Sequence, residues 1–164
     1  MTFDDYLAAE ALGRLDLSGC RQAAMRAIEE GRDSLHLAAL AGTSPEQRSV
    51  SECEQFWLFG LEELRAVVPS RYEAASRLLT YYLREVACGA VPPGDGVAEI
   101  VALATDLQDL FPNRRYVGDG MGLEVLVSLY YSKDDAAVDE KPAQAEIDGD
   151  LVEECRRVLK SRGA

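Results

Sequence analysis

The chain has 164 residues, 48% of them hydrophobic and 28% charged, which is typical of a globular protein and excludes a disordered or fibrous one. Its net charge is −12, so we expect neither nucleic acid nor a membrane as a partner, and a basic protein becomes the favoured class. No apolar run is long enough to span a bilayer and the first residues lack the pattern of a signal peptide, so we predict a cytoplasmic protein.

Helix start and stop signals divide the first 42 residues into three predicted helices. Thr2, Ser18 and Asp33 are the predicted N-caps, because each can accept a hydrogen bond from a backbone N–H of the first turn. Gly31 and Gly42 are the predicted stops. The residues expected to face inward recur at helical spacing: Phe3, Tyr6, Leu7, Ala11, Cys20, Ala23, Ala24, Ala27 and Ile28.

Two capping-box patterns predict the next two helices. Ser44-Pro45-Glu46-Gln47 begins a helix expected to run to Val68, and Ser70-Arg71-Tyr72-Glu73 begins one that stops at Gly89. Gly60 lies beside the apolar stripe of the first, so another helix is expected to pack closely there. The predicted inward positions are Val50, Cys53, Trp57, Leu61, Leu64, Val68, Tyr72, Ala75, Leu79, Tyr82, Leu83 and Val86.

Prolines and glycine predict a loop over 91–94, after which Asp95 is the expected cap of a helix that ends at Pro112. The apolar face of this helix carries Val97, Ile100, Val101, Ala104, Leu107 and Phe111.

The segment 121–131 fits two patterns. Its apolar residues alternate as in a strand, and Leu123, Leu126 and Val127 also form a helical face. A lone strand would leave its backbone groups without partners in a helical chain, so a helix is favoured.

An acidic connector over 133–141 precedes a last helix that starts near Pro142. Between Asp134 and Glu154 there are nine acids and one base, so these 21 residues carry eight of the twelve net negative charges. Such runs are commonly solvated linkers, and this one could alternatively steer a basic partner. The predicted partner-binding residues are Asp134, Asp135, Asp139 and Glu140.

These elements together predict an all-α fold, a single-domain irregular helical bundle of about eight helices covering residues 1–164. The four cysteines, Cys20, Cys53, Cys88 and Cys155, are far apart and fall at apolar-periodic positions, so we expect buried free thiols. Two disulfides are arithmetically possible but do not suit a reducing compartment.

His36 is the only histidine, and this excludes the metal sites and metalloprotease motifs that need two. Catalysis would have to use His36 as its base, for example with Ser34, but no nucleophile motif accompanies them. We therefore predict no catalytic, cofactor-binding or metal-binding residue and no cofactor.

Two stretches carry a resemblance to known proteins. Residues 30–35, continued by Leu40-Ala41-Gly42, are similar to a G-x-D-S/T…L-A-G element of short bacterial helical proteins with no established activity. Residues 83–96 resemble a second element of the same proteins. The resemblance implies an all-α bacterial protein and carries no functional residue.

The leading hypothesis for function is a non-catalytic protein-interaction module, for example one that binds a basic toxin as an immunity protein does. A small-ligand protein is an alternative from another class, with aromatic residues lining an apolar pocket. The aromatic residues that would line it are Phe56, Trp57, Tyr72, Tyr81 and Tyr82. An enzyme of a type not evident from the motifs is the third hypothesis.

Overall fold

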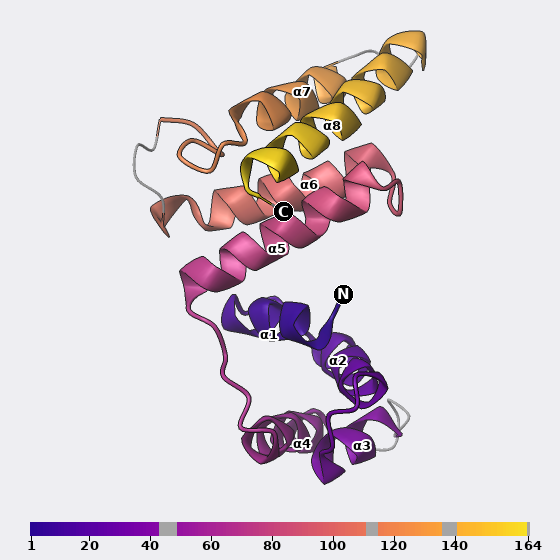
Figure 1. Cartoon of the computed structure of the whole chain (residues 1–164), viewed down its shortest axis with the longest axis vertical. Coiled ribbons are helices and arrows are strands. Elements are labelled where there is room, and N and C mark those ends of the chain that lie inside the picture. The colour runs from indigo at the N-terminus through magenta and orange to yellow at the C-terminus, as the bar shows by residue number, and fades with distance from the viewer. Residues whose placement is uncertain (43–48, 111–114, 136–140, 164) are drawn as a thin grey trace. The chain divides into compact units, whose positions relative to one another are not determined.

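The computed structural model describes residues 1–42, 49–110, 115–135 and 141–163. Its helices are α1 (Phe3–Ala11), α2 (Leu17–Glu29), α3 (Leu35–Ala41), α4 (Val50–Glu63), α5 (Arg71–Ala87), α6 (Pro93–Asp106), the short 3₁₀ helix η1 (Gln108–Leu110), α7 (Glu124–Asp135) and α8 (Lys141–Ser161) (Figure 1). Within the described ranges the chain forms helices and no strand. The predicted all-α fold of about eight helices is confirmed.

The chain divides into two compact units, unit 1 (Met1–Leu78) and unit 2 (Leu79–Ala164). The boundary lies inside α5, which contributes its first part to unit 1 and the remainder to unit 2. A single domain over 1–164 therefore stays a prediction, and each unit is described by itself.

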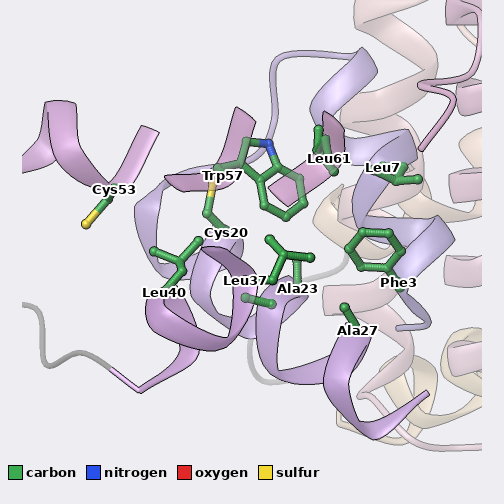
Figure 2. Close-up of a cluster of buried hydrophobic side chains, with 11 residues drawn as sticks. Phe3, Leu7, Cys20, Ala23, Ala27, Leu37, Leu40, Cys53, Trp57 and Leu61 are labelled. Carbon is green, nitrogen blue, oxygen red and sulfur yellow. The ribbon is translucent and has the colours of Figure 1, made fainter. Parts of the chain in front are cut away.

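Unit 1 is organised around α2, which contacts α1, α3 and α4. Alanines at 23, 24 and 27 are fully buried, and their small side chains let the neighbouring helices approach closely. Phe3 meets Trp57 edge to face, with ring centroids 6.1 Å apart. Figure 2 shows this core, whose buried members are Phe3, Leu7, Cys20, Ala23, Ala24, Ala27, Leu37, Leu40, Cys53, Trp57 and Leu61.

Several helix ends follow the predicted local signals. Thr2 and Asp5 form a capping box at α1, and Ser70 and Glu73 exchange the same kind of hydrogen bonds at α5. Gly31 and Gly89 adopt φ of +73° and +74°, the left-handed conformation in which a glycine ends a helix without strain. These signals act within a few residues, which explains why the sequence alone revealed them.

Other caps differ from the prediction. Asp16, not Ser18, caps α2 by accepting a hydrogen bond from Gly19 N, and Ser34, not Asp33, caps α3. Ser49 and Glu52 form the capping box of α4, so α4 does not begin at Ser44. Residues 44–47 themselves lie outside the described residues.

The end of α4 also differs from the prediction, because the helix stops at Glu63 and not at Val68. Arg65 adopts a left-handed φ of 49°, and Ala66 N donates back to the carbonyl of Leu61. This turn satisfies the last free carbonyls of the helix and leaves Val68 43% exposed. Ile28, Val50 and Tyr72 were also predicted to face inward and are exposed as well.

In unit 2, α6 contacts both α7 and α8, and α7 and α8 lie side by side (Figure 1). Asp95 is not the cap of α6, which already begins at Pro93, since proline is suited to the first turn of a helix. Phe111 and Pro112 lie outside the described residues. The buried apolar residues of α6, α7 and α8 include Val97, Ile100, Leu103, Ala104, Leu126, Leu151, Cys155 and Val158.

The segment 121–131 is helical from Glu124 onward, as favoured. Leu123 and Val127 are buried while Val125 between them is 50% exposed. A strand would place all three on one face, so the burial pattern itself is that of a helix.

Candidate functional site

The acids predicted to bind a partner lie at and beyond the end of α7. Asp135 is the last residue of α7 and is exposed. Asp134 is part of the same helical turn. Asp139 and Glu140 lie outside the described residues.

The acidic run continues along α8 as an exposed stripe. Glu146, Asp150 and Glu153 are spaced by four and three residues, so they share one face of the helix, and all three are exposed. Asp148 is different, because it forms an ion pair with Lys133 of α7 and ties the two helices together. The stripe and this ion pair therefore have separate roles on α8.

A groove of about 410 Å³ lies where α7 and α8 meet. Its apolar lining comes from Val125 and Leu129 of α7, and its acidic lining includes Asp150 and Glu153 of α8. The sequence signal for Val125 and Leu129 was their i, i+4 spacing outside the buried face of α7, which marks a second apolar stripe. The groove thus places apolar surface directly beside exposed carboxylates.

One base also lines this groove. Arg157 donates two hydrogen bonds to the nearly buried carboxylate of Glu154, at 2.7 and 2.5 Å. Hydrogen bonds to Glu154 raise the pKa of the Arg157 guanidinium. Because Glu154 and Arg157 neutralise each other, Asp150 and Glu153 are the acids that give the groove its negative potential.

His36, the one candidate for a catalytic base, belongs to a cluster that joins α3 to α4. Its Nδ1 lies 2.7 Å from one oxygen of Glu63, and the Ser34 hydroxyl donates to the other oxygen at 2.6 Å. The His36 ring also packs on Phe56 and Phe59, with centroids 5.4 and 5.2 Å away. Ser34 and His36 each bind Glu63 and so hold the two helices together.

This cluster predicts a pH dependence of stability. The Ser34 hydroxyl, and after it His36, hold the pKa of the Glu63 carboxyl below its ordinary value of 4.5. A carboxyl whose pKa is lowered by folding stabilises the fold above its unfolded pKa, and this contribution is lost as the pH falls through the folded value. We expect the urea midpoint to fall on acidification below about pH 4.5.

Glu63→Gln isolates the contribution of this carboxyl. The difference in urea midpoint between the parent chain and Glu63→Gln should shrink as the pH falls, because a protonated Glu63 resembles the amide. A difference that stays constant from neutral pH to below the folded pKa would contradict this account. Glu62→Gln, an exposed neighbour, is the control.

Three of the four cysteine thiols are buried, as predicted. All four cysteines are free; Cys20, Cys53 and Cys155 are buried, and Cys88 is exposed, which corrects its predicted inward orientation. Cys88 follows the last residue of α5 and its thiol donates to the carbonyl of Glu85. Burial, and to a smaller extent nearby acids, raise the pKa of the Cys20 and Cys155 thiols to about 12.

We expect a thiol reagent at neutral pH to modify Cys88 rapidly and the other three cysteines only on unfolding. Peptide mapping by mass spectrometry after brief labelling identifies the modified residue. Cys88→Ser should abolish the fast phase, and rapid native labelling of Cys20 would show that the core of unit 1 is more open than described.

Arginines in unit 1 form ion pairs with acids of the same unit. Arg77 Nε donates to Asp5 at 2.7 Å, and Arg32 pairs with Asp4 at the same distance. Burial alone would raise the pKa of the Asp5 carboxyl, but hydrogen bonds from Thr2 and the charge of Arg77 hold it below its ordinary value. These contacts join α1 to the segment before α3 and to the first half of α5.

Comparisons of the chain with protein-family models, with curated proteins and with solved structures find no match. In the part of the chain that the structure describes, no helix is long and apolar enough to cross a membrane. The same residues contain no group of three or more histidine, cysteine or acidic side chains that could hold a metal ion. Function is therefore inferred from the geometry and charge of the chain itself.

Proposed function

We propose that this chain is a non-catalytic protein-interaction module of the bacterial cytoplasm that binds a basic partner protein through the groove between α7 and α8. The observation that carries the proposal is the combination of an apolar floor, Val125 and Leu129, with the exposed carboxylates of Asp150 and Glu153. Apolar contact area supplies affinity once water is displaced, and the carboxylates select a partner of opposite charge.

The acidic run around the groove adds long-range attraction. Asp135, at the end of α7, and Glu146, on α8, are both exposed. Eight of the chain's twelve net negative charges lie between residues 134 and 154. Such a field accelerates diffusional encounter with a basic protein and is screened by salt. A basic toxin, bound as an immunity protein binds one, has the required chemistry.

The cytoplasmic part of the proposal is supported by the free thiols, since persistent disulfides are rare in reducing compartments. The resemblance of residues 30–42 to an element of short bacterial helical proteins supports the bacterial part.

The test uses the dominant basic partner recovered by affinity capture from the native cell and identified by mass spectrometry. Asp150→Asn with Glu153→Gln neutralises the groove while leaving the Glu154–Arg157 pair intact. The association rate at low salt should fall about tenfold, and its dependence on salt should weaken.

A second variant neutralises Asp134, Asp135, Asp139 and Glu140 together and asks whether the connector contributes to steering. The matched control is Asp33→Asn with Glu62→Gln, which removes two exposed charges from unit 1. If the groove variant associates as fast as this control at low salt, the groove is not the binding site. An unchanged rate for the connector variant alone would assign that segment as a linker.

A further inference from the structure

A second hollow, of about 460 Å³, lies within unit 1 between the end of α1, the start of α2 and the middle of α4. Its apolar lining comes from Leu15, Leu17, Leu58 and the indole of Trp57. Such a surface suits the hydrocarbon part of a ligand.

Three carboxylates surround this hollow, one from each neighbouring segment: Glu10, Asp16 and Glu54. The carboxylate of Asp16 caps α2, while Glu10 and Glu54 form no ion pair within the described part of the chain. Cys20 also lines the hollow. Burial raises the pKa of its thiol, and the negative charges of these three acids raise it further. The hollow is therefore a site of negative potential, and it would favour a cation.

The indole N–H of Trp57 gives a second and independent indication of a ligand. Trp57 is 2% exposed, and its Nε1 is buried with no hydrogen-bond partner among the described residues. Figure 2 shows the nitrogen on the edge of the indole that points away from Leu37 and Ala23, and the Trp57 side chain also lines the hollow. A buried donor without an acceptor destabilises the fold, so an occupant that supplies an acceptor gains affinity here.

We propose that this hollow binds an organic cation that also carries a hydrogen-bond acceptor, the combination present in an arginine or lysine residue with its backbone carbonyl. The guanidinium or ammonium group lies among Glu10, Asp16 and Glu54, and the aliphatic stem packs on the leucines and the Trp57 ring. The carbonyl accepts from Trp57 Nε1 after a lining side chain turns aside. Leu58 is 58% exposed, so its side chain can turn without disturbing the core.

The chain's single tryptophan makes the site directly observable by fluorescence. The probe is N-acetyl-arginine amide, titrated into the full chain while Trp57 emission is followed. The comparison ligand is N-acetyl-citrulline amide, which keeps the shape and the carbonyls but replaces the guanidinium by a neutral urea. We expect a saturable change in emission with the arginine compound and little or none with the citrulline compound.

Three variants test the assignment of the residues. Glu10→Gln with Glu54→Gln should weaken binding about tenfold or more, because hydrogen bonds to charged groups are the strong ones. Leu58→Lys places a tethered ammonium at the rim and should abolish binding. The control Asp33→Asn with Glu62→Gln removes the same charge elsewhere in unit 1 and should bind as the parent chain does.

A peptide with one central arginine distinguishes the sources of the ligand. Tighter binding of the peptide assigns the hollow to a basic side chain of a protein, and tighter binding of the amide assigns it to a free small molecule. Equal binding of the arginine and citrulline compounds overturns the proposal, and so does an unchanged affinity in the Glu10→Gln, Glu54→Gln variant. The site lies in unit 1, so its failure leaves the proposed α7–α8 groove unaffected.

Discussion

Trp57→Ala is expected to destabilise unit 1 by about 3–5 kcal/mol. Trp57 is 2% exposed in the middle of α4, contacts the Phe3 ring edge to face, and belongs to the buried cluster shown in Figure 2. Truncation removes most of the buried apolar area of the side chain and leaves a cavity that the surrounding helices fill only in part. Urea unfolding followed by far-UV circular dichroism measures the loss without relying on tryptophan emission.

Two variants serve as controls for this prediction. Leu58→Ala changes the adjacent residue, which is 58% exposed, and should change the free energy of unfolding by no more than about 0.5 kcal/mol. Trp57→Phe should lose less than Trp57→Ala, because the ring keeps part of the volume and the unpartnered N–H is removed. A loss below about 1 kcal/mol for Trp57→Ala would show that the indole is not part of the core.

Gly60→Ala is expected to destabilise unit 1 by about 1–3 kcal/mol, although alanine is the better helix former. A Cβ at residue 60 would lie 2.5 Å from both Cγ and Cδ2 of Leu37 and 3.3 Å from the Leu37 backbone nitrogen. Leu37 is fully buried in α3, so its side chain has little space into which to move. The close contact between α3 and α4 at this point requires a residue without a side chain.

Gly149→Ala is the matched control, because it changes a glycine inside α8 where a Cβ would have nothing within 4 Å. This variant should stabilise the chain by about 0.5–1 kcal/mol through helix propensity alone. Urea midpoints of the two variants should therefore move in opposite directions. A stabilised Gly60→Ala would mean that α3 and α4 do not pack at this point as described.

The sequence by itself determined the helical class of this protein and many of its helix limits. The caps at Thr2 and Ser70 and the stops at Gly31 and Gly89 depend on hydrogen bonds and φ values within one turn of helix, so neighbouring residues suffice to predict them. Central core residues such as Trp57 were also evident, because they lie in the middle of a periodic apolar stripe.

Only the tertiary structure decided between adjacent candidates for the same role. Asp33 and Ser34 are both good N-caps. Ser34 is the cap in the structure, because its hydroxyl accepts a hydrogen bond from Leu37 N and donates one to the Glu63 carboxylate, 29 residues away. Burial at the ends of the apolar stripes likewise depends on where a partner helix stops, which explains the exposure of Val50 and Val68.

The two candidate sites also depend on tertiary structure. Val125 and Leu129 become the floor of a groove only because α8 packs beside α7, and Glu10 and Glu54 share a hollow although 44 positions separate them in the chain. The acidic composition predicted a basic partner. Composition does not say which acids lie close together in space, so it did not predict either site. The positions at which carboxylates converge on apolar surface are set by long-range packing, and local sequence patterns do not encode them.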